Sequence, residues 1–249
     1  MFVTRGVLGA ILITCAGSKA AFAQMDLPKL QELSRTAVAQ RWVSVEPPSI
    51  SIQGRTLEYY LGGVSFFLPE QFGDPLLGAV VSEELRVQAL RNVRRNPLGQ
   101  QFWNNVLPQV ESIVSQQLVV YQSDRPREQC EMEIGGLTEQ IWQTYDTAFK
   151  DEAQRRGLQA SPVAAAQGPR SVTITTAPPG GKVFLMHVLE AQLAAVMNRP
   201  PKWLEADESG SFNVDGQYWY SIQRDGVSST PKRIDFNADE NRTEYVLRD

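Results

Sequence analysis

The chain has 249 residues, of which 24 are basic, 28 are acidic and one is a histidine, so its formal net charge is −4. Because there is no basic excess to displace counterions, this composition argues against nucleic acid as a general partner. An apolar fraction of 42% with 9% aromatic residues is ordinary for a globular protein and argues against an intrinsically disordered chain. The single histidine, His187, excludes a metal site built from several histidines.

Residues 1–23 have the three-part pattern of a secretory signal peptide. Arg5 supplies the positive start, residues 6–16 are apolar and uncharged, and Ala21-Phe22-Ala23 matches an A-x-A cleavage motif. The apolar run is shorter than the roughly 20 residues that span a bilayer. We therefore expect cleavage and export to the periplasm, the cell envelope or the outside of the cell. An uncleaved anchor and a lipid-modified Cys15 are the alternatives.

Cleavage would leave Cys130 as the sole cysteine, because Cys15 lies within the signal. An internal disulfide is then impossible, so we expect a buried thiol and a fold held by its core, with an intermolecular disulfide as the alternative. Loss of Arg5 and Lys19 leaves 22 basic residues against 28 acidic ones, a net charge of −6. No later segment has 18 uncharged apolar residues in a row, so at most a peripheral membrane contact is expected.

The region that follows the signal, residues 24–156, is predicted to be mainly helical. Apolar residues recur every three or four positions in four segments: residues 27–42, 82–97, 102–118 and 128–156. Gly135-Gly136 is expected to weaken or split the last of these helices. Residues 43–68 instead alternate and contain Gly54 and Gly62-Gly63, which predicts a small β-hairpin or meander.

Two clusters in this region allow a functional interpretation beside a structural one. Arginines gather on and beside the second helix: Arg86, Arg91, Arg94 and Arg95. They could face an acidic partner or anionic lipid, but short charge clusters are mostly solvated faces that pair with nearby acids. Trp142, Tyr145 and Phe149 could line a ligand groove, whereas an aromatic stripe at helical spacing more often belongs to the core.

A linker is predicted at residues 157–170, which contain Pro162, Gly168 and Pro169 and few large apolar side chains. Beyond it the sequence period changes to two, which predicts strands at residues 172–175, 182–185, 216–224 and 244–247. Residues 188–198 are helical in composition and interrupt these strands. We therefore predict an α+β protein with a helix-rich N-terminal domain at residues 24–156 and a β-sandwich-like domain at residues 171–249.

The run SVTITTAPPGGKVFL, residues 171–185, places a Pro-Pro-Gly-Gly turn between two predicted strands. It resembles the opening of PEGA-type domains, small β-sandwich modules of bacterial envelope and surface proteins. The turn matches the family's Pro-Glu-Gly-Ala at its first and third positions and differs at the other two. Residues 216–220 resemble the family's glycine-then-aromatic strand, and residues 234–247 resemble its last strand pair. The family's short hairpin is replaced by the insert at residues 188–203. The resemblance implies a non-catalytic adhesive or scaffolding module.

Catalytic motifs are missing from the sequence, which has no G-x-S-x-G, no P-loop and no G-x-G-x-x-G. Cys130 and His187 could form a nucleophile–base pair, since such pairs need only spatial closeness. No cysteine-protease signature surrounds Cys130, so a histidine on a strand is the simpler interpretation. We expect no cofactor.

Acidic residues gather near the start of the last predicted N-terminal helix: Asp124, Glu128, Glu131 and Glu133. Two acids across a cleft would suit a glycosidase, but acids also favour the positive end of the helix dipole. Asp235, Asn237 and Asp239 have the spacing of a calcium loop. Glu240 and Val246 replace the glycine and the glutamate that such a loop requires, so we expect no metal site.

Three hypotheses for function remain. The first is an exported, non-catalytic scaffold, envelope-associated or secreted, whose helical domain contacts an unidentified protein partner. The second is carbohydrate or peptidoglycan binding by the β-domain through four aromatic residues: Trp203, Tyr218, Trp219 and Tyr220. Strand alternation puts the two tyrosines on one face and Trp219 on the other, and we expect at least one of these faces to be buried. The third is a carboxylate-dependent hydrolase.

Overall fold

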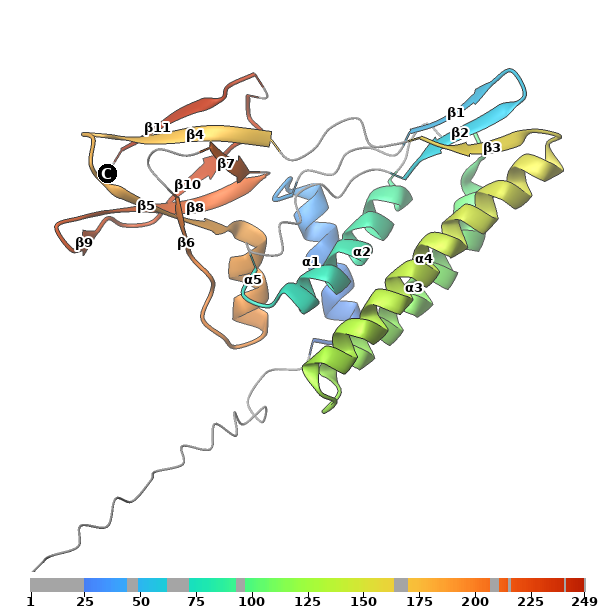
Figure 1. Cartoon of the computed structure of the whole chain (residues 1–249), viewed down its shortest axis with the longest axis horizontal. Coiled ribbons are helices and arrows are strands. Elements are labelled where there is room, and N and C mark those ends of the chain that lie inside the picture. Colours follow the sequence, from blue (N-terminus) through green and yellow to red (C-terminus); the bar gives the residue numbers. More distant parts are fainter. Residues whose placement is uncertain are drawn as a thin grey trace, which may run out of the picture.

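The computed structural model describes residues 25–43, 49–61, 72–92, 97–163, 170–206, 211–214, 216–239 and 241–248. The predicted signal peptide lies outside these residues. Within them, a helix-rich N-terminal part is followed by a C-terminal part made mostly of sheets, which confirms the predicted α+β class (Figure 1).

The described residues form five helices: α1 (Leu27–Ala39), α2 (Pro75–Arg91), α3 (Gln100–Gln122), α4 (Arg127–Arg155) and α5 (Val188–Val196). Asp26 and Asp74 cap α1 and α2, because their carboxylates accept hydrogen bonds from backbone N–H groups of the first turn. The second helix begins at Pro75 and not at the predicted residue 82. Residues 75–81 are buried on nearly all sides, so their sequence lacks the periodicity from which a helix could have been predicted. Gly135-Gly136 does not split α4, which runs unbroken for 29 residues.

Eleven strands occur in the same described part of the chain: β1 (Ser49–Gln53), β2 (Thr56–Tyr60), β3 (Gln159–Pro162), β4 (Arg170–Ala177), β5 (Lys182–His187), β6 (Leu204–Ala206), β7 (Ser211–Val214), β8 (Gln217–Arg224), β9 (Val227–Ser228), β10 (Lys232–Asp235) and β11 (Glu244–Arg248). The strands β1 and β2 form the predicted antiparallel hairpin, with Gly54 at φ +59° in its turn. Residues 62–68, the last part of the region predicted to be a hairpin or meander, lie outside the described residues.

The predicted linker contains a strand near its start. Residues 159–162 form β3, which pairs in parallel with β2 and completes a three-stranded sheet in the order β1-β2-β3. The pairing is extended at both ends, where Gln159 N donates to Arg55 O (2.8 Å) and Val163 N donates to Tyr59 O (2.9 Å). The remainder of the predicted linker, residues 164–169, is not described, and the domain boundaries stay a prediction.

The C-terminal strands form two facing sheets with a core between them, as the sandwich prediction required. One sheet has the order β10-β8-β5-β6, with β9 attached to β8, and the other has the order β11-β4-β7. Apolar side chains from both sheets fill the space between them, including Val172, Leu185, Tyr218, Phe236 and Leu247. The Pro-Pro-Gly-Gly turn carries the chain from β4 in one sheet to β5 in the other, while β10 and β11 lie in different sheets.

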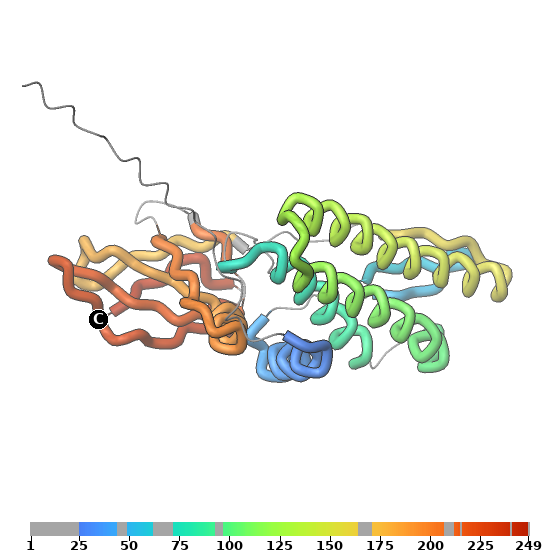
Figure 2. The backbone as a smooth tube through the Cα atoms, turned by 90° about the horizontal axis from the view of Figure 1, so that it is seen from below, coloured from blue at the N-terminus to red at the C-terminus, as the bar shows by residue number. Residues whose placement is uncertain are grey.

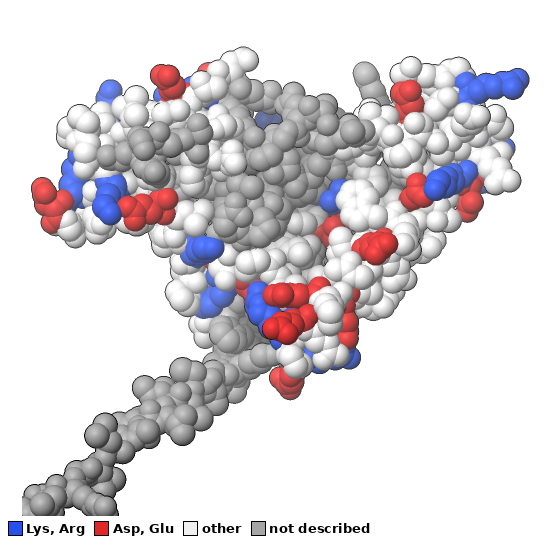
Figure 3. Space-filling model, viewed as in Figure 1, with Lys and Arg blue, Asp and Glu red and all other residues white. Residues whose placement is uncertain are grey.

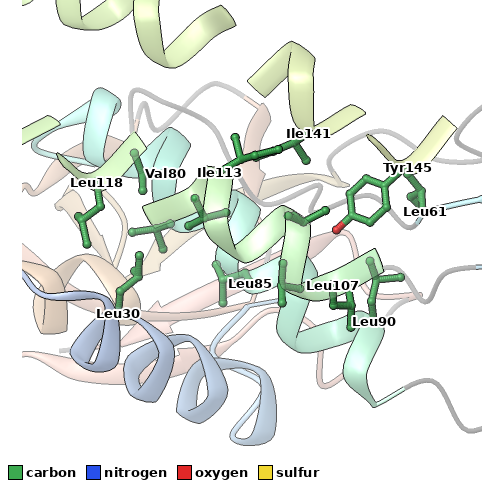
Figure 4. Packing of buried hydrophobic residues seen from close by; sticks show 14 of the residues in the cluster. Leu30, Leu61, Val80, Leu85, Leu90, Leu107, Ile113, Leu118, Ile141 and Tyr145 are labelled. Carbon is green, nitrogen blue, oxygen red and sulfur yellow. The ribbon is translucent and has the colours of Figure 1, made fainter. Parts of the chain in front are cut away.

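The four N-terminal helices pack around a second core, part of which is shown in Figure 4. Tyr145 and Phe149 are fully buried there, so their predicted role in the core is confirmed. Trp142 is 41% exposed, and the Arg86 guanidinium lies 4.3 Å from the centre of its ring. Arg86 itself is buried and forms a 3.2 Å ion pair with Glu83. The prediction that Arg86 lies on a solvated face of the helix is therefore wrong.

The short helix α5 joins the two parts of the molecule (Figure 2). Leu189, Leu193 and Met197 belong to the N-terminal helical core, although they follow β5 of the sandwich in sequence. The carboxylate of Glu190, which is fully buried, accepts hydrogen bonds of 2.5 and 2.8 Å from the guanidinium of Arg199. α5 therefore packs with the helices while remaining attached to a sandwich strand.

Candidate functional site

The alternation of β8 separates the aromatic residues that the sequence pointed to. Tyr218 is 0% exposed and lies inside the sandwich, with its ring centre 4.9 Å from that of His187 and 5.4 Å from that of Phe236. The prediction that Tyr218 binds a ligand is therefore wrong, because a fully buried core side chain cannot reach one. Tyr220 points to the same side, packs against the sandwich core and donates its hydroxyl to Arg248 O at 3.2 Å.

Trp219 lies on the opposite, outer face of the five-stranded sheet. Its direct partners across the sheet are Met186 on β5 and Arg233 on β10. The pairing of β5 with β6 ends at Leu185 and Leu204, and Trp203 directly precedes Leu204. Extending this antiparallel register by one residue would place Trp203 opposite Met186. On that extended register the order across this face is Arg233, Trp219, Met186, Trp203, which we call the tryptophan row.

The geometry of the tryptophan row follows from the pleated sheet. Neighbouring strands lie about 4.8 Å apart, so on this extended register the backbones of Trp219 and Trp203 would be separated by about 10 Å. Both tryptophans are half-buried, and Met186 between them is 8% exposed. The Arg233 guanidinium lies 5.5 Å from the centre of the Trp219 ring, within cation–π range.

Polar groups border the tryptophan row. Arg233 donates to Gln217 Oε1 at 2.6 Å, and Gln217 Nε2 donates to Asp235 Oδ2 at 3.1 Å. Farther along the same face, Lys182 and Glu205 form an exposed ion pair of 2.9 Å. The face thus combines apolar ring surface with hydrogen-bond donors and acceptors, a mixture that suits a ligand with both apolar and polar faces.

The other chemical candidates do not form sites. Cys130 is buried between α3 and α4, where its thiol contacts Val120 O (3.4 Å) and Ser123 Oγ (3.7 Å). His187 lies at the start of α5, and its Nδ1 accepts from the N–H of Leu189 (3.0 Å). The structure does not bring Cys130 and His187 together, so the nucleophile–base pair is not formed.

Two members of the acidic cluster, Glu131 and Glu133, form surface ion pairs. Glu131 pairs with Arg127 at 3.0 Å, and Glu133 pairs with Arg125. In the segment with the spacing of a calcium loop, Asp235 accepts a hydrogen bond from the backbone N–H of Asn237 (2.9 Å). Across the described ranges, no group of three acidic, cysteine or histidine residues is placed to hold a metal ion.

The described residues thus form an α+β protein that has a helical part, a two-sheet sandwich and a row of aromatic residues on the outer face of one sheet. No family model, curated protein or solved structure matches the chain. A search of the described helices finds none that is both long and apolar enough to cross a membrane.

Proposed function

We propose that the protein is an exported, non-catalytic binding protein whose sandwich binds carbohydrate through the tryptophan row. One observation carries the proposal: two half-buried tryptophans stand in a single row across one sheet face, bordered by Arg233, Gln217 and Asp235. Indole rings offer rigid apolar surface on which the apolar faces of sugar rings stack. The polar neighbours supply donors and acceptors for sugar hydroxyls. The expected export makes an envelope polysaccharide such as peptidoglycan the ligand we favour.

The test is binding of the purified chain to insoluble polysaccharides, with peptidoglycan, chitin and cellulose as the probes. Trp219→Ala and Trp203→Ala are each expected to weaken binding at least about tenfold, because each removes one stacking surface worth about 1.4 kcal/mol or more. The matched control is Trp142→Ala, which removes an exposed tryptophan from the helical part and should leave binding unchanged.

Two outcomes would overturn this proposal. The first is unchanged binding by the Trp203→Ala, Trp219→Ala double variant while its circular dichroism spectrum stays that of the parent chain. The second is an equal loss of binding in the Trp142→Ala control, which would show that the polysaccharide adsorbs to exposed indoles in general.

A scaffold function is the second candidate, and a chain of ring contacts favours it. The His187 ring lies 5.8 Å from Phe72 in the helical core and 4.9 Å from Tyr218 in the sandwich. Tyr218 in turn contacts Phe236, and Phe236 contacts Tyr245 at 4.8 Å. Aromatic rings therefore connect the two cores through His187, the last residue of β5. This arrangement would hold the helical part in a fixed position relative to a bound sandwich.

Cell fractionation followed by crosslinking tests the scaffold function. A scaffold should be recovered from the envelope crosslinked in fixed proportion to one protein. Recovery of the native protein as an uncrosslinked monomer in every fraction would contradict that function and leave the carbohydrate proposal standing.

A further inference from the structure

The outer surface of the α3–α4 hairpin carries an open groove that is separate from the tryptophan row. Its volume is about 500 Å³, and both helices and the turn between them line it. Val119, Val120 and Leu137 give it apolar walls, and Arg125 and Glu133 form an ion pair at its edge. A groove between two antiparallel helices has the shape in which a third helix packs.

Large apolar side chains stand exposed beside this groove. Val119 on α3 is 67% exposed, and Met132 on α4 is 73% exposed. Met132 lies one helical turn before Gly136, which lines the groove. Single exposed apolar residues are normal, but two that flank one groove form the kind of patch that a partner buries.

The glycine pair of α4 leaves the backbone of this surface open. A Cβ atom at Gly135 or at Gly136 would meet nothing within 4 Å, so no contact within the described chain requires glycine at either position. Each glycine inside a helix costs about 1 kcal/mol relative to alanine. A partner backbone that packs closely against α4 at Gly136 would explain why glycine is present there, because any other residue would place a side chain in the space next to the helix.

The charge around the groove indicates what kind of partner fits. Residues 119–140 contain five acids and two arginines: Asp124, Glu128, Glu131, Glu133, Glu139, Arg125 and Arg127. Both arginines are already paired with acids, whereas Asp124, Glu128 and Glu139 form no salt bridge with any described residue. Figure 3 shows acidic side chains, with basic ones among them, gathered at the lower end of the hairpin. A second copy of the same surface would bring like charges together, so the charge favours a basic occupant.

We propose that this groove binds an amphipathic helix of a partner protein, with apolar residues packed toward Val119 and Met132 and with lysines or arginines facing the acids. Anchors at positions i, i+3, i+4 and i+7 of that helix would enter the groove. The proposal deepens the scaffold function by naming the chemistry of the partner. It does not depend on the tryptophan row.

The experiment uses the full chain and two fluorescein-labelled synthetic helices of 18 residues, read by fluorescence anisotropy. One peptide carries leucine on one face and lysine on the other, and its match has glutamate in place of lysine. We expect the leucine–lysine peptide to bind and the leucine–glutamate peptide to bind at least about tenfold more weakly. Absence of binding by the leucine–lysine peptide, or equal binding of both, overturns the proposal.

The adjacent glycines provide a matched pair of variants. Gly136→Leu fills the groove and should weaken binding of the leucine–lysine peptide at least about tenfold. Gly135→Leu adds the same side chain one position away, outside the groove lining, and should change affinity less than about twofold. Both changes raise helix propensity, so neither should unfold α4. Equal effects of the two variants would overturn the proposal. So would a dimer, detected by light scattering, that Gly136→Leu dissociates, because a second copy would then occupy the groove.

Discussion

The amide nitrogen of Gln217 donates a 3.0 Å hydrogen bond to the carbonyl oxygen of Trp42, which ties the first residue of β8 to the segment that follows α1. Gly216, directly before Gln217, has φ +85°, and a Cβ atom there would lie 2.2 Å from the same carbonyl oxygen. We predict that Gly216→Ala lowers the free energy of unfolding by about 2–4 kcal/mol, from backbone strain together with the clash. Guanidinium denaturation measures this loss.

Gly226→Ala is the control for the Gly216 contact. Gly226 also has a left-handed φ of +78°, but a Cβ atom there would meet nothing within 4 Å. Only the backbone strain of about 1–2 kcal/mol applies to it. Equal losses in the two variants would contradict a close contact between β8 and Trp42.

Removal of the Tyr145 hydroxyl and removal of the Tyr59 hydroxyl should change the free energy of unfolding in opposite directions. The Tyr145 hydroxyl is buried and has no hydrogen-bond partner among the described residues, so Tyr145→Phe should raise the free energy of unfolding by about 1 kcal/mol. The Tyr59 hydroxyl donates to the Asp146 carboxylate at 2.6 Å, and Tyr59→Phe should lower it by about 1–2 kcal/mol. Urea denaturation of both variants tests the pair, and a loss in both would show that Tyr145 has a partner after all.

Glu84 should make the stability of the protein depend on pH. Burial, with a smaller contribution from Glu111, raises the pKa of the Glu84 carboxyl to about 7, above its ordinary value of 4.5. The folded state then binds this proton more tightly than the unfolded state does, so stability is lost as the pH rises from about 4.5 to 7. The loss amounts to at most about 3 kcal/mol, at 1.36 kcal/mol per pKa unit. Burial also raises the pKa of Glu83, in the same direction.

The measurement for Glu84 is the difference in free energy of unfolding between Glu84→Gln and the parent chain at pH 4 and pH 8. Glutamine keeps the oxygen that accepts from Gln88 Nε2 at 2.6 Å. We expect the variant to gain stability over the parent chain between pH 4 and pH 8. Glu139→Gln, on the exposed surface, should show no such change, and a pH-independent difference for Glu84→Gln would contradict the prediction.

The buried ion pair between Glu190 of α5 and Arg199 should contribute far more to the stability of the fold than an exposed ion pair does. Arg199→Met leaves the fully buried Glu190 carboxylate with a backbone N–H, that of Lys202 at 2.8 Å, but without the guanidinium. Breaking one side of a buried pair costs about 3–5 kcal/mol. Lys182→Met, which breaks the exposed pair with Glu205, should cost less than about 1 kcal/mol. Thermal unfolding of both variants tests the contrast, and similar shifts would contradict it.

Local patterns in the sequence predicted much of the fold. The hairpin at Gly54, the helical periods and the alternation of β8 are all properties of neighbouring residues, so they could be read without tertiary contacts. The same alternation correctly separated Trp219 from Tyr218 and Tyr220. It could not add Met186 and Arg233 to the candidate site, because their place beside Trp219 depends on which strands pair.

Features that depend on distant partners were missed. β3 was predicted to be part of a linker, since its partner β2 lies about a hundred residues earlier and nothing local marks residues 159–162 as a strand. Arg86 was expected in solvent, because a charge cluster gives no sign that Trp142 on α4 will cover it. In both cases tertiary packing overrode the local tendency.

The position of α5 determines what a protease would release from this protein. A cut between residues 162 and 170 would sever the chain after the four N-terminal helices and β3, yet α5 would remain on the other fragment. The N-terminal fragment would then lose the side chains of Leu189, Leu193 and Met197 from its interior. Two nicked halves should therefore elute together from a sizing column, because the C-terminal half holds part of the core of the N-terminal half.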